Sequence, residues 1–373
     1  MNISELETKL PTLKRFKVVV GFDAFIDETI RVVAKRGHGS MELMDQMEHY
    51  GSWVNASAGR SGLREVVSEN VSAGGCSVNM GDGLSTFGVS ILAYIGFGKV
   101  VHPVFNEFQA KCCRVVNTGI EPGRTTVHEF KDGKLMLCYL SHLASFDGAF
   151  VRKNFKDTPF ILDCKSADAI VFTTWSVFPN ATDAWRTIGE EILKDITHRP
   201  HIFFDIADPA SRSGVDLKEV LGVISNFEKC GRVTLSLNGN EANQVAQVLG
   251  LPKSSSNTKE LESQAQGIRE RMGISEICIH LIKSATVATQ EEVATVMGPY
   301  CEFPKKSVGA GDRFNAGYLS GILLTLGIQE RLILGCASSG YFVRNGVSAT
   351  PEALAETCRT WKKNGNCGDL FSP

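Results

Sequence analysis

Six short apolar runs recur along the chain, and their alternation with longer stretches constrains the fold more than any other feature. The runs span residues 16–22, 89–97, 168–175, 201–207, 232–238 and 275–282. Segments of helical character lie between most of them. This alternation is typical of a parallel sheet covered by helices on both faces, so we expect an α/β fold.

Ligands of such folds bind beyond the carboxyl ends of the strands. Several polar residues follow the predicted strands and are therefore of interest, namely Asp23, Asp27, Asp205, Asp208, Asn238 and Glu241.

Two regions interrupt the alternation. Residues 31–66 are rich in Gly, Ser, Met and His, and we expect an irregular insertion there. Residues 124–140 read as a β-hairpin, because two apolar segments flank Asp132-Gly133, a pair suited to a tight turn. A hairpin inserted in a series of strands and helices could act as a lid. A surface hairpin without function is the alternative.

Length and composition exclude several classes of function. The 373 residues fit one large domain with an excursion, or two domains, since about 100–200 residues per domain is usual. The formal net charge of −2 does not indicate a nucleic-acid or membrane partner. No run of about 18 apolar residues predicts a membrane span. The eleven cysteines lack CxxC spacing, so we interpret them as reduced thiols of a cytoplasmic protein.

Two standard phosphate-binding loops, GxxxxGK[ST] and GxGxxG after a strand, are missing from the sequence. Another device is present at residues 309–311, Gly-Ala-Gly. It precedes an apolar pattern with helical spacing that Gly327 would end, formed by Leu319, Ile322, Leu323 and Leu326. The free N–H groups and the dipole of such a helix start favour a bound anion.

Asp312 follows this Gly-Ala-Gly directly and has two interpretations. It could be an ordinary acid in the first turn of a helix, where it interacts favourably with the dipole. It could instead be a general base beside an anion site, which deprotonates a hydroxyl that attacks a phosphoryl group. The spacing alone favours neither interpretation.

Asn238 and Glu241 are three residues apart at a predicted strand–helix junction. An amide and a carboxylate on one side of a helix could hold a hydrated Mg²⁺ near phosphates, since Mg²⁺ keeps several waters and takes few protein ligands. A helix capping box is the alternative.

Two further motifs could hold a polyol. Gly74-Gly75 would let a polyol lie against the backbone, and Asn79 offers a donor and an acceptor to neighbouring hydroxyls, although a turn with a cap is an alternative. Asp27 lies just past the first strand and could accept hydrogen bonds from a diol. A solvated acid in a loop is the alternative for Asp27.

In this order along the chain, the motifs resemble those of the PfkB/ribokinase-like carbohydrate kinase superfamily, with matched pieces from Gly21 to about Gly346. The resemblance implies a ribokinase-like α/β fold, with a central, mostly parallel sheet, helices on both faces and a small β lid. It implies a single domain over residues 1–373, with lid elements at about 28–72 and 121–141.

The resemblance also assigns roles to residues. It implies that residues 309–311 (Gly309, Ala310 and Gly311) form an anion hole and that Asp312 is the base. The acceptor would be held by Asp27, Gly74, Gly75 and Asn79, with Arg124 available if the acceptor carries a phosphate. Nucleotide contacts would come from Asn238, Glu241, Lys283 and Gly346, the first two also placing Mg²⁺ through water.

The implied activity is transfer of the γ-phosphoryl group of ATP to a hydroxyl of a sugar or sugar-like alcohol. A monovalent cation is a further cofactor that the resemblance allows, and a homodimer is left open. Two departures from the family pattern are Lys306, where an Asp is usual, and "KSATVAT" in place of a Gly-rich turn. Two alternatives therefore remain: an ADP-dependent sugar kinase, suggested by "GFDAFID", and a non-catalytic sugar-binding sensor.

Overall fold

A nine-stranded sheet forms the centre of the protein in the computed structural model, which describes residues 3–255 and 257–364. The strand order is β14-β13-β12-β11-β10-β9-β1-β5-β6, parallel from β12 to β6, with β13 and β14 antiparallel at one edge. The strands are β1 (Lys17–Phe22), β5 (Ser90–Ile95), β6 (Arg114–Asn117), β9 (Ala169–Thr173), β10 (His201–Asp205), β11 (Arg232–Asn238), β12 (Glu276–His280), β13 (Ser284–Ala288) and β14 (Val293–Met297). Each of the six predicted runs contains one of these strands.

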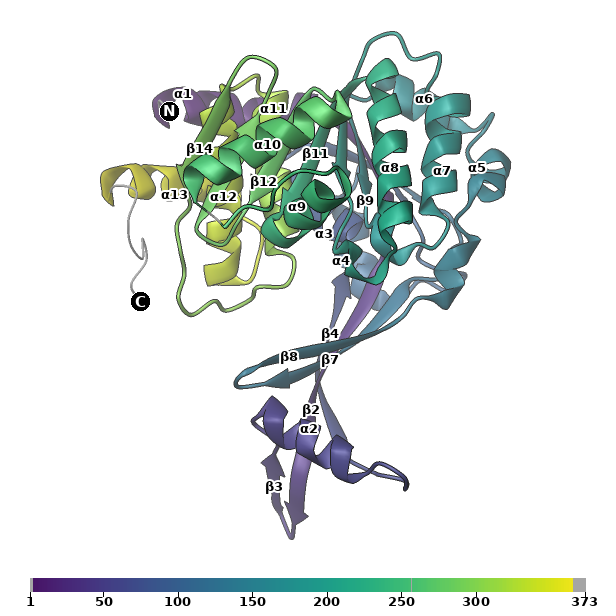
Figure 1. The fold of residues 1–373 in the computed structure, drawn as a ribbon, viewed down its shortest axis with the longest axis vertical. Coiled ribbons are helices and arrows are strands. Elements are labelled where there is room, and N and C mark those ends of the chain that lie inside the picture. Colours follow the sequence, from purple (N-terminus) through teal and green to yellow (C-terminus); the bar gives the residue numbers. More distant parts are fainter. Residues whose placement is uncertain (1–2, 256, 365–373) are drawn as a thin grey trace.

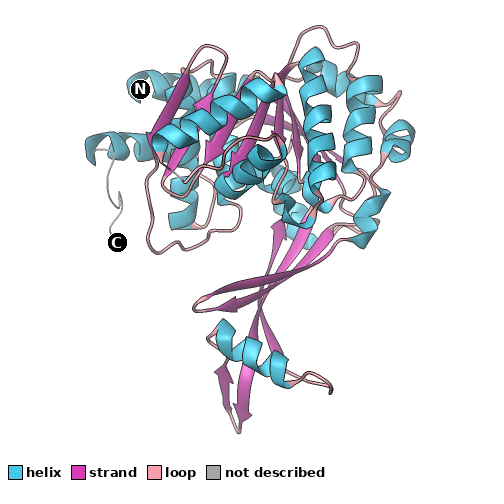
Figure 2. Ribbon diagram, in the orientation of Figure 1, coloured by secondary structure: helices cyan, strands magenta, loops and turns pink. Residues whose placement is uncertain are grey.

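Helices cover both faces of this sheet, as Figures 1 and 2 show. One apolar core joins the sheet to α5 (Gly148–Asn154), α6 (Pro159–Ser166), α7 (Ala181–Thr187), α8 (Gly214–Asn226), α9 (Gly239–Val248) and α10 (Thr258–Met272). A second core on the opposite face joins it to α1 (Ile3–Lys9), α3 (Cys76–Thr86), α4 (Asn106–Lys111), α11 (Ala310–Leu323), α12 (Ile328–Asn345) and α13 (Pro351–Asn364). Neighbouring residues in the strands alternate between the two cores, as Phe203 and Phe204 do. No helix of the described part combines the length and apolar content needed to cross a membrane.

A second, smaller sheet projects from the main body (Figure 1). It contains β2 (Phe25–Gly37), β3 (Ser40–Leu43), β4 (Val66–Gly74), β7 (Gly123–Phe130) and β8 (Gly133–Tyr139). Here β2 pairs in parallel with β7 and antiparallel with β4, and β7 pairs antiparallel with β8. This small sheet agrees with the β element that the family resemblance implies.

The expectation of an irregular segment at 31–66 was wrong. These residues form most of β2, all of β3 and the helix α2 (Met47–Ala56), which lies along the small sheet (Figure 1). They make a separate small core in which Val32 and Met44 pack with Phe130, and Tyr50 of α2 lies 5.5 Å from the Phe130 ring. Because Phe130 belongs to a strand far along the chain, the local sequence gives little indication of this order.

The predicted hairpin is present as β7 and β8, but its turn lies one residue earlier than expected. Phe130 pairs with Gly133, so Lys131 and Asp132 form the two-residue connection. The carboxylate of Asp132 accepts a hydrogen bond from the backbone N–H of Met47, over 2.9 Å to Oδ1. This contact ties the turn to α2 and accounts for an acid at that position.

One other local expectation was also wrong. Gly327 does not end α11, which stops at Leu323; Gly327 is instead the N-cap of α12, and its N–H donates to Glu330. The segment "KSATVAT", noted in place of a Gly-rich turn, mostly forms β13, which pairs antiparallel with β12. The connection before β13 consists of residues 281–283.

Candidate active site

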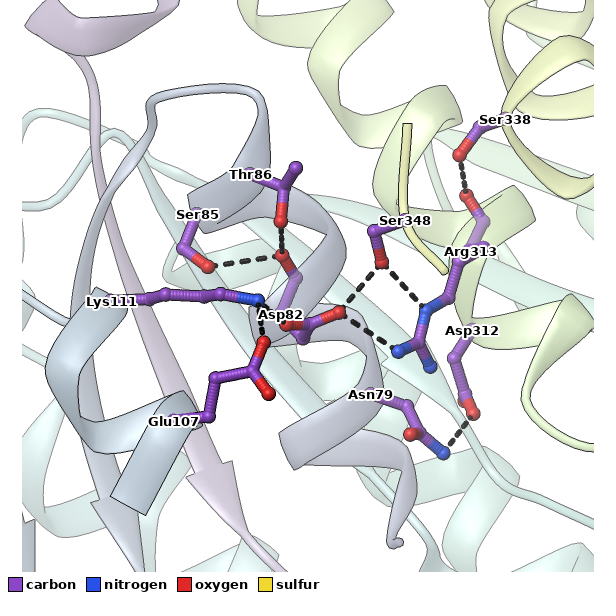
Figure 3. Close-up of polar contacts among 10 residues, drawn as sticks. All are labelled: Asn79, Asp82, Ser85, Thr86, Glu107, Lys111, Asp312, Arg313, Ser338 and Ser348. Carbon is purple, nitrogen blue, oxygen red and sulfur yellow. Dashed lines mark hydrogen bonds and ion pairs between the residues drawn. The ribbon is translucent and has the colours of Figure 1, made fainter. Parts of the chain in front are cut away.

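Asp312 lies in the first turn of α11, close to α3 and to the carboxyl ends of the central strands. Its side chain is only 8% exposed, and Asn79 of α3 donates a hydrogen bond from Nδ2 to Oδ2 of Asp312 over 2.9 Å (Figure 3). The structure thus joins two residues 233 positions apart that the sequence assigned to different roles, one as base and one as an acceptor contact.

The surroundings of Asp312 raise the pKa of its carboxyl group toward neutral pH. Burial, followed by the charge of Asp205, raises the pKa of Asp312 to about 7. Arg313 and the hydrogen bond from Asn79 act in the opposite direction. Burial also lowers the pKa of His280, which lies beside Gly311, to about 4, so this imidazole is neutral near pH 7. Asp312 can therefore accept a proton at the pH at which a general base has to work.

A second carboxylate, Asp205 at the end of β10, holds α11 one turn after Asp312, through Asn315. Asn315 donates from Nδ2 to Oδ2 of Asp205 over 2.6 Å, and Ser236 of β11 donates to Oδ1 of Asn315 over 2.7 Å. The backbone N–H of Ala207 donates to the other oxygen of Asp205 over 2.8 Å. Burial raises the pKa of Asp205 to about 6. These bonds hold the first turns of α11 against two strands of the sheet.

The start of α11 opens into a cavity. This cavity has a volume of about 1200 Å³, and Ala310 and Gly311 line it. Gly309 adopts a φ of +86° at the N-cap, which glycine accommodates without strain. The N–H of Ala310 donates to the Ser307 carbonyl, whereas those of Gly311 and Asp312 have no hydrogen-bond partner among the described residues. These N–H groups are available to an anion.

Two of the residues predicted to contact a nucleotide, Asn238 and Lys283, also line this cavity. Gly346 does not. It is the C-cap of α12, where its φ is +76°, and the side chain of Lys305 lies beside it. The structure therefore brings Asn238 and Lys283 to the cavity, whereas Gly346 and Glu241 are not among the residues that line it.

Asn238 and Glu241 form the capping box that was the alternative to a metal site. Oδ1 of Asn238 accepts from the N–H of Glu241 over 3.0 Å, and Oε2 of Glu241 accepts from the N–H of Asn238 over 2.8 Å. Nevertheless, burial and the neighbouring Asp205 and Asp208 raise the pKa of Glu241. A buried carboxylate among other acids is a favourable neighbour for a cation.

Gly74 and Gly75 make room for carboxylates. A Cβ atom at residue 74 would lie 2.0 Å from Oδ2 of Asp27, and one at residue 75 would lie 2.6 Å from Oδ2 of Asp23. Gly75 also has a φ of +98°. The space that we expected a polyol to use beside these two glycines is therefore occupied by acidic side chains.

These two acids differ in their surroundings. Asp27 lies within β2 rather than in a loop, and burial raises its pKa, while Thr125 and Lys306 oppose this effect. Asp23 is 1% exposed, and its Oδ1 accepts from Thr173 over 2.7 Å. Its Oδ2 has no hydrogen-bond partner among the described residues. The solvated loop acid was therefore the wrong alternative for Asp27.

Arg124 does not share a face with Asp27. In the small sheet Asp27 pairs with Thr125, and Arg124 pairs with Ile26, so the two side chains point to opposite faces. The cation near Asp27 is Lys306, whose half-buried ammonium lies 5.6 Å from the Phe342 ring. Burial, then Arg313, lowers the pKa of Lys306.

Several residues of the site were not predicted from the sequence. Asp205 and Asp23 were noted only as strand ends, and Asn315, Arg313 and Asp82 were not noted. A usable signal for Asn315 was its spacing, since it follows Asp312 by three residues and therefore lies on the same side of α11. No local signal identifies Asp82, whose partners lie far along the chain.

The fold is that of the ribokinase-like carbohydrate kinases. Arabidopsis thaliana ribokinase, solved with ribose and ATP, aligns with a TM-score of 0.65 at 13% identity, over 92% of this chain and 98% of that one. A carbohydrate kinase from Agrobacterium tumefaciens aligns with a TM-score of 0.63 at 16% identity, over 92% of this chain and 97% of that one. At these identities the likeness shows the fold.

The chain belongs to the prokaryotic ketohexokinase family, whose sequence profile matches residues 2–361. A ketohexokinase from Haloferax volcanii is 26% identical over 344 residues, which is 91% of this chain and 89% of that protein. The protein is therefore a carbohydrate kinase, a transferase of phosphoryl groups to an alcohol. The predicted superfamily, fold class and enzyme class are confirmed, and the family implies the use of ATP.

Proposed function

We propose that the protein transfers the γ-phosphoryl group of ATP to a hydroxyl group of a ketohexose. The observation that carries this proposal is the position of Asp312. Asp312 accepts a hydrogen bond from Asn79. It also directly follows Ala310 and Gly311, which line the 1200 Å³ cavity. A carboxylate at this boundary can reach an acceptor hydroxyl while phosphate groups occupy the cavity.

In the proposed reaction, Asp312 takes the proton of the acceptor hydroxyl. The freed oxygen forms a bond to the γ-phosphorus, and the bond from that phosphorus to the bridging oxygen breaks and releases ADP. The N–H groups of Gly311 and Asp312 stabilise the charge on the phosphoryl oxygens. Asn79 keeps the carboxylate in place through its hydrogen bond. Positioning and electrostatics thus account for most of the rate.

The residues present fit a hydrated Mg²⁺ better than a direct metal cage. No group of three or more His, Cys, Asp or Glu side chains suited to a metal occurs in the described ranges, but Glu241 is a buried carboxylate beside Asp205. When bound, Mg²⁺ would neutralise phosphate charge. Glu241, with Asn238, is the proposed residue to hold its waters.

We expect Glu241→Gln to raise the Mg²⁺ concentration needed for half-maximal activity by about 10-fold or more, because the buried charge is lost. The capping box persists, since glutamine also serves at that position. The matched control is Glu330→Gln, which makes the same change at the start of α12, where Gly327 donates to Glu330. An Mg²⁺ response equal in the two variants would show that Glu241 acts only as a cap.

The pH dependence follows from the site. We expect kcat/KM to fall as the pH drops below about 7, with a slope of one, because a protonated Asp312 cannot accept a proton. Asp205, with a pKa of about 6, protonates at lower pH, and because its charge then no longer raises the pKa of Asp312, the fall becomes shallower there. Initial rates at low acceptor concentration between about pH 5 and pH 9 provide the test. A profile without a fall on the acid side would contradict the assignment.

The small sheet is proposed as a lid over the acceptor within a single domain. Asp27 lies in β2 on the side of the sheet nearest Lys306, where it can accept hydrogen bonds from acceptor hydroxyls. Closure would exclude water and limit hydrolysis of ATP. Arg124 points to the other face, so the proposed acceptor contacts are Asp27 and Asn79, with the two glycines providing the space for the acids. The cytoplasmic location, the monovalent cation and the homodimer stay predictions.

Nucleotide consumption across a panel of acceptors tests the proposal. The panel contains ketohexoses, aldohexoses, pentoses, sugar phosphates and nucleosides, each with ATP or ADP and Mg²⁺. We expect turnover with ATP that depends on a ketohexose. Turnover with ADP alone would move the protein to the ADP-dependent kinases. Turnover confined to another acceptor class would contradict the ketohexose assignment.

A further inference from the structure

We propose that Arg313, Asp82 and Ser348 form a brace between α3 and α11 that positions Asp312 against Asn79 and limits the positive charge that reaches it. We call these three residues the brace. The proposal deepens the proposed function and rests on it, because it concerns the residue that takes the proton there. The three residues of the brace are positioning residues, since they act on the reaction through Asp312.

The guanidinium of Arg313 is held in one place by several contacts (Figure 3). Nη2 donates to Oδ2 of Asp82 over 2.9 Å, and Nε donates to Oγ of Ser348 over 3.1 Å. Ser348 in turn donates to the same Oδ2 of Asp82 over 2.6 Å. The guanidinium also lies 4.6 Å from the centre of the Phe342 ring, and Arg313 is only 7% exposed. A buried arginine with these contacts has little freedom to turn toward Asp312.

The other end of the brace lies on the helix that carries Asn79. Asp82 follows Asn79 by three residues in α3, so both side chains lie on the side that faces α11. Lys111 donates to the second oxygen of Asp82 over 2.7 Å. Burial by itself raises the pKa of Asp82, but Arg313, Lys111 and Ser348 together hold it below its usual value. Asp82 therefore stays ionised over the working range of the enzyme.

Two glycines allow the helices to approach closely enough for these contacts. A Cβ atom at Gly83 would lie 2.7 Å from Cβ of Ala316. A Cβ atom at Gly309 would lie 3.0 Å from Nη1 of Arg313 and 3.2 Å from Nδ2 of Asn79. The brace and the bond between Asn79 and Asp312 therefore depend on the same close packing.

Charge gives the brace a second effect. The charged and titratable groups around Asp312 come from each neighbouring element and are Asp23 after β1, Cys76 and Asp82 in α3, Asp205 at the end of β10, Glu241 in α9, His280 in β12, Lys306 before α11, and Arg313 itself. The acids favour protonated Asp312, and Arg313 opposes them. Because Asp82 neutralises Arg313 and holds it toward α3, Asp312 keeps a pKa high enough for a base.

This arrangement predicts that substitutions at Arg313 and at Asp82 shift the pKa of Asp312 in opposite directions. Arg313→Gln removes the cation, so Asp312 should titrate about one pH unit higher than in the wild type. Asp82→Asn leaves Arg313 without its anion and free to approach Asp312, so Asp312 should titrate about half a pH unit lower. In the Arg313→Gln background, Asp82→Asn should have a much smaller effect, because Asp82 acts through Arg313.

Carboxyl ¹³C NMR of the full chain labelled at aspartate measures this titration without any substrate, with Asp312→Asn identifying the resonance. The pH at which kcat/KM falls on the acid side should shift in the same direction as the titration midpoint of the Asp312 resonance. Arg313→Lys, which keeps the charge, should restore most of the wild-type titration. A milder second variant, Ser348→Ala, covers the case in which Arg313→Gln folds poorly. It keeps both charges of the brace, and Asp312 should then titrate at a slightly lower pH than in the wild type.

A matched control separates these effects from the general loss of a buried ion pair. Arg331 of α12 pairs with buried Glu276 of β12 over 2.7 Å, and Arg331→Gln should lower stability without moving the titration of Asp312. The proposal is overturned if Arg313→Gln and Asp82→Asn shift the titration in the same direction, or if Arg331→Gln shifts it equally. An absence of kinase activity in the wild type would refute the proposed function, while the NMR titration would still test the brace.

Discussion

Asp312→Asn should reduce kcat by about 10²–10⁴-fold, because the variant keeps the shape of the site but loses the group that accepts the proton. The bond from Asn79 can persist, since asparagine also has a side-chain oxygen. Acceptor and nucleotide binding, measured by calorimetry, should therefore change little. A variant that kept more than about a tenth of the wild-type kcat would show that Asp312 is not the base.

The same substitution should stabilise the protein at high pH. The pKa of Asp312 is raised from 3.8 to about 7 in the folded state, so the folded state holds this proton more tightly than the unfolded one. Stability is then lost as the pH rises from about 4 through 7, by an amount on the order of a few kcal/mol, and asparagine avoids that loss. Urea unfolding at about pH 8 and pH 4 measures the difference, which should be larger at pH 8.

A control variant tests the simpler interpretation of an acid at a helix start. Asp216 lies in the first turn of α8, and its side chain carries, among the described residues, only a long ion pair of 3.6 Å with Arg212. Asp216→Asn should cost about 0.3–1 kcal/mol of stability through the helix dipole and leave kcat unchanged. If Asp312→Asn behaved in the same way, Asp312 would be a helix acid only.

Gly74→Ala should raise the KM for the acceptor by about 10–100-fold, with a smaller effect on kcat. The new Cβ atom would lie 2.0 Å from Oδ2 of Asp27, so this carboxylate must leave its position. A charged hydrogen bond is worth about 1.5–3 kcal/mol, which corresponds to the expected loss. Initial rates over a range of acceptor concentrations, at saturating ATP, measure the change.

Two further variants sharpen this test. Gly222→Ala in α8 adds a methyl group with nothing within 4 Å and should leave KM unchanged. In the Asp27→Ala background, Gly74→Ala should add little, because the group it displaces is already missing. A KM within about twofold of the wild type for Gly74→Ala would mean that Asp27 does not hold the acceptor.

The sequence predicted the parts of the molecule that local patterns determine. Each predicted apolar run coincides with a strand, and residues 309–311 do begin a helix, because burial on both faces and glycine at an N-cap leave strong local signals. The hairpin at residues 124–140 was likewise predicted, since a two-residue turn depends on neighbouring residues. Family motifs then supplied the order of these pieces and the class of enzyme.

Contacts between distant residues could not be predicted in this way. The order of residues 31–66 depends on Phe130, and the space beside Gly74 is filled by Asp27 from another strand. The brace joins Asp82 to Arg313 and Ser348, more than two hundred positions away. Patterns of spacing along one chain carry no information about such pairs, so the charge balance around Asp312 emerged only from the structure.

The most direct test of the central claim is ³¹P NMR of the products after incubation with ATP, Mg²⁺ and a ketohexose such as fructose. The account predicts a sugar phosphate monoester and ADP in equal amounts with the wild-type protein, and neither within the same time with Asp312→Asn. Unchanged ATP with every ketohexose, or inorganic phosphate without a sugar phosphate, would contradict it.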